Sequence, residues 1–223
     1  MLASVSSLDE ALRILAFDVD IVDLKQPSDG ALGALPVQEA AKIVKAVNGQ
    51  RPVSATIGDL PMQPDIVVNA VVEMAGTGVD YIKIGFFPEG DWTATLDALA
   101  PLAQAGLPLI AVLFADTEPD LNGIGVFKQA GFKGVMLDTM HKHRGSLVQV
   151  LAQDAIGAFV ARSAEYQLLC GLAGSLGAED IPPLLRLQPD YLGFRGALCN
   201  RRNRTARLDN DAIEAVVRQM QSG

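Results

Sequence analysis

Three of the chain's seven lysines stand at or just after the C-terminal ends of short, apolar, strand-like runs. In the block DIVDLKQPSDGALGA, Asp23 and Lys25 are two residues apart, so both side chains point to the same side of a strand. Lys83 follows in DYIKIG, and the run VMLDTMHKH places Asp138 at a strand end with Lys142 on the next loop. Charged side chains on an inward strand face are costly unless they are paired and used.

This pattern predicts a lysine that attacks a carbonyl carbon and forms a Schiff base. Burial and neighbouring cations lower the pKa of a lysine, and the neutral amine is the nucleophile. We expect Lys83 to lower the pKa of Lys25 in this way. Asp23 and Asp138 would balance the charge and move protons. We predict these four residues and Lys142 as catalytic, and the alternative is a purely structural network of ion pairs in the mouth of a barrel.

Glycine-containing runs after the last two predicted strands indicate an anion site. The run GLAGSLGAED contains Gly174 and Ser175, and the run GFRGALCN contains Arg195 and Gly196. Backbone N–H groups in such loops and an arginine guanidinium bind phosphate oxygens. Because the loops after strands 7 and 8 often form the phosphate site of (β/α)8 barrels, we predict these four residues as phosphate ligands.

Composition and charge narrow the class of protein, because a net charge of −8 over 223 residues argues against a broad nucleic-acid surface. Only His141 and His143 offer imidazole, so we expect no metal site, and no other pattern calls for an organic cofactor. Cys170 and Cys199 lack metal-ligand spacing and are expected to be buried free thiols. We find no signal peptide and no apolar run long enough for a bilayer, which predicts a cytoplasmic protein without a membrane partner.

These side chains need a scaffold that brings several strand ends to one place. Short β-like runs alternate with segments of helical period along the whole chain. The predicted strands are residues 2–5, 20–25, 52–57, 80–85, 107–114, 134–138, 168–173 and 191–195, and the predicted helices are residues 8–16, 36–48, 65–77, 92–105, 121–130, 145–165, 178–187 and 209–221. Eight such units predict parallel strands in one α/β domain, a (β/α)8 TIM barrel over residues 1–223. An open doubly wound sheet is the alternative.

Six blocks of the sequence occur in an order and at a spacing that resemble a known family. They are DIVDLKQPSDGALGA, SATIGDLP, DYIKIG, MLDTMHK, LAGSL and GFRGALC, and they span nearly the whole chain. Together they resemble the (5-formylfuran-3-yl)methyl phosphate synthase family, also called 4-(hydroxymethyl)-2-furancarboxaldehyde phosphate synthase. The block that begins at Asp23 is the most specific. The loop FADTEPDLNG after the fifth strand and the pair Met140-His141 depart from the pattern.

The resemblance implies a (β/α)8 lyase that condenses two molecules of glyceraldehyde 3-phosphate to a furan aldehyde phosphate, with loss of one phosphate and of water. This would be an early step in the biosynthesis of methanofuran-type one-carbon carriers. By the same resemblance Lys25 would form the Schiff base and Lys83 would accept protons. It also implies that the other residues of the predicted catalytic set line the site: Asp23, Asp138 and Lys142.

Two triose phosphates need two anion sites, at least briefly. We expect Lys142, with Arg144 or Arg201, to hold the second phosphate, and the cationic loop of residues 201–207 either to attract an anionic substrate or to lie in solvent. Two other functions stay open: a Schiff-base aldolase with one phosphosugar substrate, and a silent barrel that serves as a scaffold in a one-carbon enzyme complex. The expected partner is a small phosphorylated aldehyde, and the sequence leaves self-association open.

Overall fold

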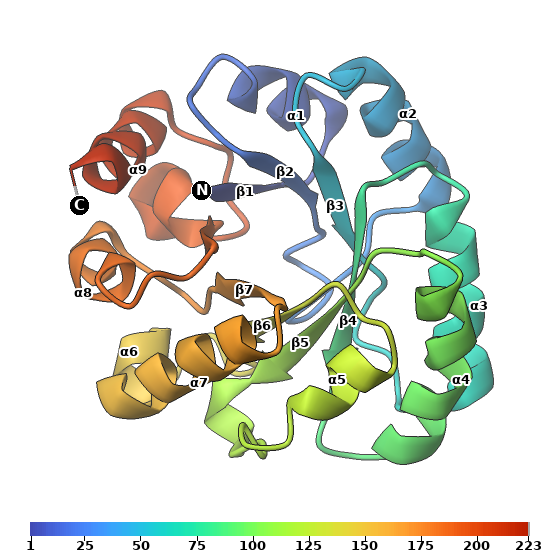
Figure 1. Cartoon of the computed structure of the whole chain (residues 1–223). Helices are drawn as coiled ribbons and strands as arrows, with labels where there is room; N and C mark the ends of the chain where they lie inside the picture. The colour runs from blue at the N-terminus through green and yellow to red at the C-terminus, as the bar shows by residue number, and fades with distance from the viewer. Residues whose placement is uncertain (223) are drawn as a thin grey trace.

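The computed structural model describes residues 1–222 and shows a closed barrel of eight parallel strands (Figure 1). The strands are β1 (Leu2–Val5), β2 (Ile21–Leu24), β3 (Val53–Thr56), β4 (Tyr81–Phe86), β5 (Leu109–Phe114), β6 (Gly134–Asp138), β7 (Leu169–Leu172) and β8 (Tyr191–Phe194). Each strand pairs in parallel with the next along the chain, and β8 pairs with β1 to close the barrel. The predicted (β/α)8 barrel is confirmed, and the open doubly wound sheet is wrong.

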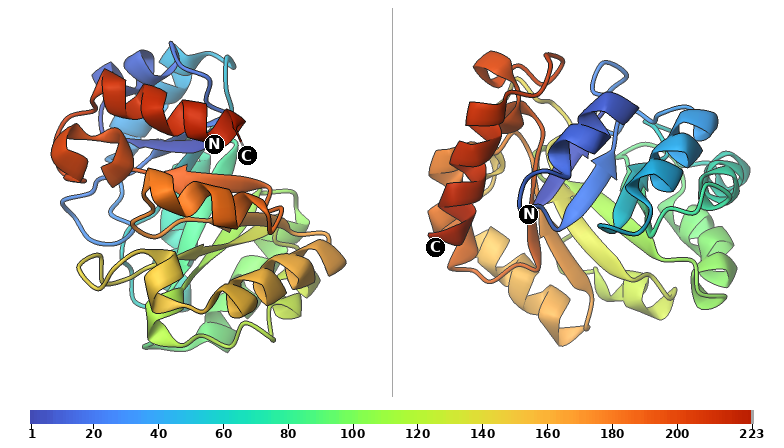
Figure 2. Two further views of the ribbon diagram at one scale, coloured as in Figure 1. Left: turned by 90° about the vertical axis from the view of Figure 1, so that its left-hand side faces the viewer. Right: turned by 90° about the horizontal axis from the view of Figure 1, so that it is seen from above.

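Helices form the outer layer around the strands (Figures 1 and 2). The α-helices are α1 (Leu8–Ile14), α2 (Val37–Val47), α3 (Pro64–Ala75), α4 (Trp92–Gln104), α5 (Gly125–Gln129), α6 (Leu147–Val150), α7 (Gln153–Glu165), α8 (Ile181–Leu185) and α9 (Asn210–Gln221). The 3-10 helices are η1 (Ala115–Thr117), η2 (Ala178–Asp180), η3 (Gly196–Leu198) and η4 (Asn200–Arg202). Over the described residues, every helix is too short or too polar to cross a membrane.

Three predicted helices differ from the observed ones. The predicted helix over residues 178–187 is divided into the 3-10 helix η2 and the α-helix α8. The predicted helix over residues 145–165 is divided into α6 and α7, because the backbone is extended at Leu151. The predicted helix over residues 121–130 begins only at Gly125. Before it, the Asp120 carboxylate accepts the backbone N–H of Asn122 at 2.9 Å, which stabilises a turn in place of the first helical turn.

Capping side chains fix several helix starts. Ser7 Oγ accepts the N–H of Glu10 at 3.2 Å at the start of α1, and Asp209 accepts the N–H of Ala212 at 3.0 Å at the start of α9. After α3, Gly78 has φ +83°, a left-handed conformation that glycine adopts without a steric penalty. Such turns keep the connections short, so that each helix returns the chain to the N-terminal end of the next strand.

Alternation along the strands separates an apolar layer from a polar barrel interior. In β2, Val22 and Leu24 are buried on the helix side, whereas Asp23 faces the barrel axis, as predicted. The ring of Phe86, at the end of β4, packs edge-to-face on Trp92 with centroids 5.3 Å apart. The main apolar core therefore lies between strands and helices, and the C-terminal mouth of the barrel is left for charged side chains.

Candidate active site

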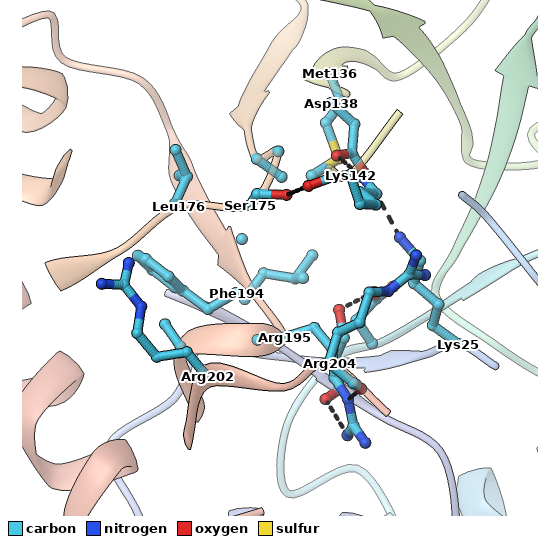
Figure 3. A pocket seen from close by; sticks show the side chains of 18 of the residues that line it. Lys25, Met136, Asp138, Lys142, Ser175, Leu176, Phe194, Arg195, Arg202 and Arg204 are labelled. Atoms are coloured by element: carbon cyan, nitrogen blue, oxygen red, sulfur yellow. Dashed lines mark hydrogen bonds and ion pairs between the residues drawn. The ribbon is translucent and has the colours of Figure 1, made fainter. Parts of the chain in front are cut away.

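One cavity of about 300 Å³ at the C-terminal ends of the strands is lined by all nine residues predicted as catalytic or as ligands of the first phosphate (Figure 3). The nine come from β2, β4 and β6 and from the segments that follow β2, β6, β7 and β8. They are Asp23, Lys25, Lys83, Asp138, Lys142, Gly174, Ser175, Arg195 and Gly196. The fold therefore brings together side chains that are up to 173 positions apart in the sequence, from Asp23 to Gly196.

The most buried ion pair of the cavity joins Lys83 and Asp23. Lys83 Nζ lies 2.6 Å from Asp23 Oδ1, and the two side chains are 3% and 0% exposed. The Asp23 carboxylate also accepts hydrogen bonds from Ser4 Oγ at 2.7 Å and from Ser54 Oγ at 2.6 Å. Parallel register places Ser4 and Ser54 directly beside Asp23 on the neighbouring strands. This carboxylate is well satisfied, and it fixes the position of the Lys83 amine.

A second carboxylate, Asp138, is shared between two lysines. Its Oδ2 lies 3.5 Å from Lys25 Nζ, while its Oδ1 contacts Lys142 Nζ and accepts the N–H of Thr139 at 2.7 Å. Burial tends to raise the pKa of Asp138, but the charges of Lys142 and Lys25 outweigh burial and hold it well below its ordinary value. Asp138 is therefore ionised and balances two cations with one negative charge.

Lys25 is the most loosely paired of the three lysines. Its side-chain hydrogen bonding within residues 1–222 consists of the 3.5 Å contact with Asp138. Burial lowers the pKa of Lys25 to about 8, against the opposing charge of Asp138. The charges of Lys142 and Lys83 contribute to this lowered pKa, so the expected influence of Lys83 is present and that of Lys142 is larger. At this pKa roughly one amine in ten is neutral at pH 7, compared with fewer than about one in a thousand for an ordinary lysine.

Backbone N–H groups form a second feature, here called the phosphate cup (Gly174, Ser175 and Gly196). Gly174 has φ +110°, and a Cβ at this position would lie 2.9 Å from the Thr139 side chain, so the tight turn after β7 requires glycine. η3 begins at Gly196 on the loop after β8. Within the described chain, the N–H groups of Ser175 and Gly196 have no protein acceptor. Free N–H groups that line a cavity are suited to phosphate oxygens.

The Arg195 guanidinium, predicted as a phosphate ligand, is engaged elsewhere. It binds both carboxylate oxygens of Glu10, at 2.6 and 3.2 Å, and the two side chains are 8% and 9% exposed. It also donates to the backbone carbonyl oxygens of Ser4, Arg204 and Ala206. These five contacts use all five N–H donors of a guanidinium, so none is left for a phosphate group. We correct the role of this side chain from ligand to structural anchor.

The arginines that line the cavity are not the ones that we expected at a second phosphate. Arg144 and Arg201 are not among the residues that line the cavity, whereas Arg202 and Arg204 are. Arg202 pairs with Glu179 at 3.0 Å on the exposed rim. Sequence reasoning noted this cationic loop but could not select its inward member, because an irregular loop has no periodicity from which a direction could be predicted. Ser4 was also missed, although its inward position follows from alternation along β1.

The two histidines and the two cysteines do not line the cavity. Within residues 1–222, no three His, Cys, Asp or Glu side chains are arranged to hold a metal ion. His141 Nδ1 lies 3.0 Å from an Asp116 carboxylate oxygen that also accepts the backbone N–H of His141, an arrangement that fixes the loop after β6. Cys170 and Cys199 are buried free thiols, as predicted, and burial raises the pKa of Cys170 to about 12.

One group of known proteins is similar to this chain in sequence, and another group is similar to it in fold. Residues 1–217 match the family described as 4-HFC-P synthase. A (5-formylfuran-3-yl)methyl phosphate synthase of Methanopyrus kandleri is 33% identical over 219 residues, covering 92% of each chain. A Methylorubrum extorquens protein, named provisionally as the same synthase, is 42% identical over 100% of this chain and 92% of its own length. Phosphoribosyl anthranilate isomerase from Thermococcus kodakaraensis has the same fold, with a TM-score of 0.68 at 18% identity over 100% of this chain and 98% of that one.

Proposed function

The chain belongs to the 4-HFC-P synthase family, and from this membership we propose that it converts two molecules of glyceraldehyde 3-phosphate to (5-formylfuran-3-yl)methyl phosphate through a Schiff base on Lys25. The observation that carries the proposal is the state of Lys25, a buried and loosely paired amine with a pKa near 8 in a cavity lined by cations. A neutral amine adds to an aldehyde and loses water to give an imine.

The atoms of this reaction balance without an oxidant or a reductant. Two molecules of C3H7O6P give C6H7O6P, one H3PO4 and two H2O. One triose forms the imine, loses the proton on the adjacent carbon to give an enamine, and loses its phosphate by β-elimination. The other triose keeps its phosphate, becomes joined to the first by a new carbon–carbon bond, and supplies the remaining ring atoms. Ring closure and loss of the two waters complete the furan.

The two ion pairs suit the proton transfers that these steps need. We assign proton exchange with substrate carbons to Lys83, because Asp23 holds its amine in one place and compensates its charge when protonated. Asp138 keeps Lys142 next to the Lys25 amine, where the positive charge of Lys142 favours the neutral form of Lys25. The phosphate cup would hold one phosphate group. The product would serve the synthesis of methanofuran-type one-carbon carriers.

Borohydride trapping tests the proposal directly. The protein is incubated with glyceraldehyde 3-phosphate and sodium borohydride, digested, and analysed by peptide mass spectrometry beside Lys25→Arg. We expect a reduced three-carbon adduct on the peptide that contains Lys25, and none in the variant. A parallel reaction without borohydride should develop the near-ultraviolet absorbance of a conjugated furan aldehyde. An adduct on Lys83 would exchange the two roles, and no adduct on a folded protein would refute imine catalysis.

A further inference from the structure

Arg204 differs from every other cation that lines the cavity. Within the described chain, each of the others forms a salt bridge with a carboxylate: Lys25 and Lys142 with Asp138, Lys83 with Asp23, Arg195 with Glu10, and Arg202 with Glu179. Arg204 has no carboxylate within salt-bridge distance among residues 1–222. An unpaired guanidinium in a half-buried position has lost hydration without gaining a counter-ion.

The position of Arg204 is nevertheless well defined. Its Nη2 donates to the carbonyl oxygen of Gly30, on the loop after β2, at 2.7 Å. No other hydrogen bond from its guanidinium to a protein acceptor occurs within the described residues, so most of its five donors are available. Burial lowers the pKa of Arg204, while Asp138 and Asp59 act in the opposite direction. It stays charged, because arginine is effectively always protonated.

Both loops that hold Arg204 are fixed by hydrogen bonds. The carbonyl oxygen of Arg204 accepts the Nε–H of Arg195 at 2.8 Å, so the Arg195–Glu10 pair anchors the segment that carries it. On the other side, Asp59 accepts the backbone N–H groups after Gly30, at 2.6 and 2.7 Å. Arg204 therefore bridges the loops after β8 and β2 across the mouth of the cavity, on the side of Lys25 and opposite Ser175 (Figure 3).

We propose that Arg204 binds the phosphate group of the second triose phosphate, the one that does not form the imine, as a phosphate subsite separate from the phosphate cup. The inference rests on the proposed function, because that reaction brings two phosphomonoesters into one cavity. A guanidinium with free, planar donors matches the oxygens of a phosphomonoester dianion. The residues that define the cup offer neutral N–H groups, whereas the Arg204 subsite contributes a positive charge of its own, so the two subsites differ in charge.

Inorganic phosphate tests the subsite without any turnover. Calorimetric titration of the wild type should give two phosphates per chain, and Arg204→Gln should bind one. Arg207→Gln is the matched control, because Arg207 lies in the same loop, is exposed, and does not line the cavity. We expect it to bind two. A single phosphate on the wild type, or two on Arg204→Gln, would overturn the inference, whatever the protein does with trioses.

Competition between substrates tests the role in the reaction. Unphosphorylated glyceraldehyde can replace only the second triose, because the first must expel phosphate, so a mixture with glyceraldehyde 3-phosphate gives a furan alcohol beside the furan phosphate. We expect the wild type to prefer glyceraldehyde 3-phosphate over glyceraldehyde as the second triose. Arg204→Gln should reduce that preference about 10- to 100-fold, because this is the loss in binding that removal of charged hydrogen bonds usually causes. Arg204→Lys should retain part of it.

The outcomes separate the two proposals. If the wild type forms a Lys25 adduct and furan phosphate, but Arg204→Gln keeps the wild-type product ratio, the subsite assignment is wrong and the proposed function stands. If the wild type forms neither, the proposed function fails, and the phosphate titration alone decides whether Arg204 is an anion site. An unchanged thermal unfolding midpoint and circular dichroism spectrum would show that Arg204→Gln is folded.

Discussion

Two groups of buried charges lie within the same barrel, and they are satisfied to different degrees. The Arg195–Glu10 pair uses both carboxylate oxygens and all five guanidinium donors. In the lysine cluster, by contrast, Asp138 serves two cations and Lys25 has one contact of 3.5 Å. A fully satisfied pair stabilises the fold and has no donor left for a ligand. A buried charge with too few partners destabilises the fold, and its perturbed pKa is of use only in a reaction with a substrate.

The same contrast recurs inside the lysine cluster. Asp23 accepts three hydrogen bonds or ion pairs and is fully buried, so Lys83 is held firmly. Lys25 shares the Asp138 carboxylate with Lys142, and the pKa of Lys25 is lowered to about 8. The comparison therefore assigns the nucleophile to the loosely paired lysine and proton transfer to the firmly held one. Four substitutions test it.

Replacement of Lys25 should have the largest effect on activity. We expect Lys25→Met to lower furan formation by roughly 10⁴- to 10⁶-fold, the upper value being typical for loss of a covalent nucleophile. It should not destabilise the fold, because Asp138 keeps Lys142 as a partner.

The charge of Lys25 also affects stability. Its pKa in the folded protein lies below the ordinary value of 10.5, so the charged amine destabilises the fold below about pH 8. This destabilisation fades as the pH rises towards 10.5.

The free energy of unfolding in urea, measured at pH 7 and at pH 10, tests this prediction. Lys25→Met should be at least as stable as the wild type at pH 7, and its advantage should shrink at pH 10. Lys42→Met is the control, because Lys42 forms an exposed pair with Glu39 and should change neither activity nor stability appreciably. A Lys25→Met variant that loses activity through unfolding would contradict the comparison.

Lys83→Arg tests proton transfer apart from charge. Arginine keeps a positive charge next to Asp23 but does not release a proton near neutral pH. We expect furan formation to fall by about 10²- to 10³-fold, the usual contribution of a positioned acid–base group. The borohydride adduct on Lys25 should still form, since imine formation needs only the amine of Lys25. If the adduct disappeared in a folded Lys83→Arg variant, Lys83 would be required before the imine and the assignment would need revision.

Asp138→Asn and Lys142→Met should shift the pH dependence of the enzyme in opposite directions. The kcat/KM of the wild type should rise with pH through a limb near 8, as Lys25 loses its proton. Asp138 raises the pKa of Lys25, so Asp138→Asn should move this limb to lower pH. Lys142 lowers that pKa, so Lys142→Met should move the limb to higher pH and reduce the rate at pH 7 several-fold. Equal limbs in all three proteins would show that Lys25 does not control the profile.

The sequence predicted the barrel and the clustering of the three lysines at one cavity because both depend on periodicity. All eight strands were located as short β-like runs between segments of helical period, and the two-residue spacing of Asp23 and Lys25 placed them on one face. The fate of Arg195 could not be predicted, because Glu10 is 185 positions away and only the closed barrel brings them together. Arg204 was missed for the same reason, since the contacts that position it are with Gly30 and Arg195.

Replacement of Glu10 should have the smallest effect on chemistry and a clear effect on stability. Glu10→Gln leaves a buried guanidinium without its counter-ion, which should lower the free energy of unfolding by about 3 kcal/mol. Glu179→Gln removes the exposed partner of Arg202 and should cost no more than about 1 kcal/mol. The Lys25 adduct should be unaffected in Glu10→Gln, because Glu10 touches no lysine of the cluster. The KM for glyceraldehyde 3-phosphate should rise a few-fold, since Arg195 holds the segment that carries Arg204.

The pH dependence of this stability difference identifies its source. Burial tends to raise the pKa of Glu10, but its hydrogen bonds and ion pair with Arg195 and Ser6 hold it below the ordinary value of 4.5. A depressed carboxyl pKa contributes stability that is present above about pH 4.5 and is lost as the pH falls through the folded value. The wild type should therefore lose more stability on acidification than Glu10→Gln, and the two unfolding curves should converge. Parallel curves would mean that the Arg195–Glu10 pair acts through packing alone, and the distinction between this fully satisfied pair and the incompletely satisfied lysine cluster would no longer rest on charge.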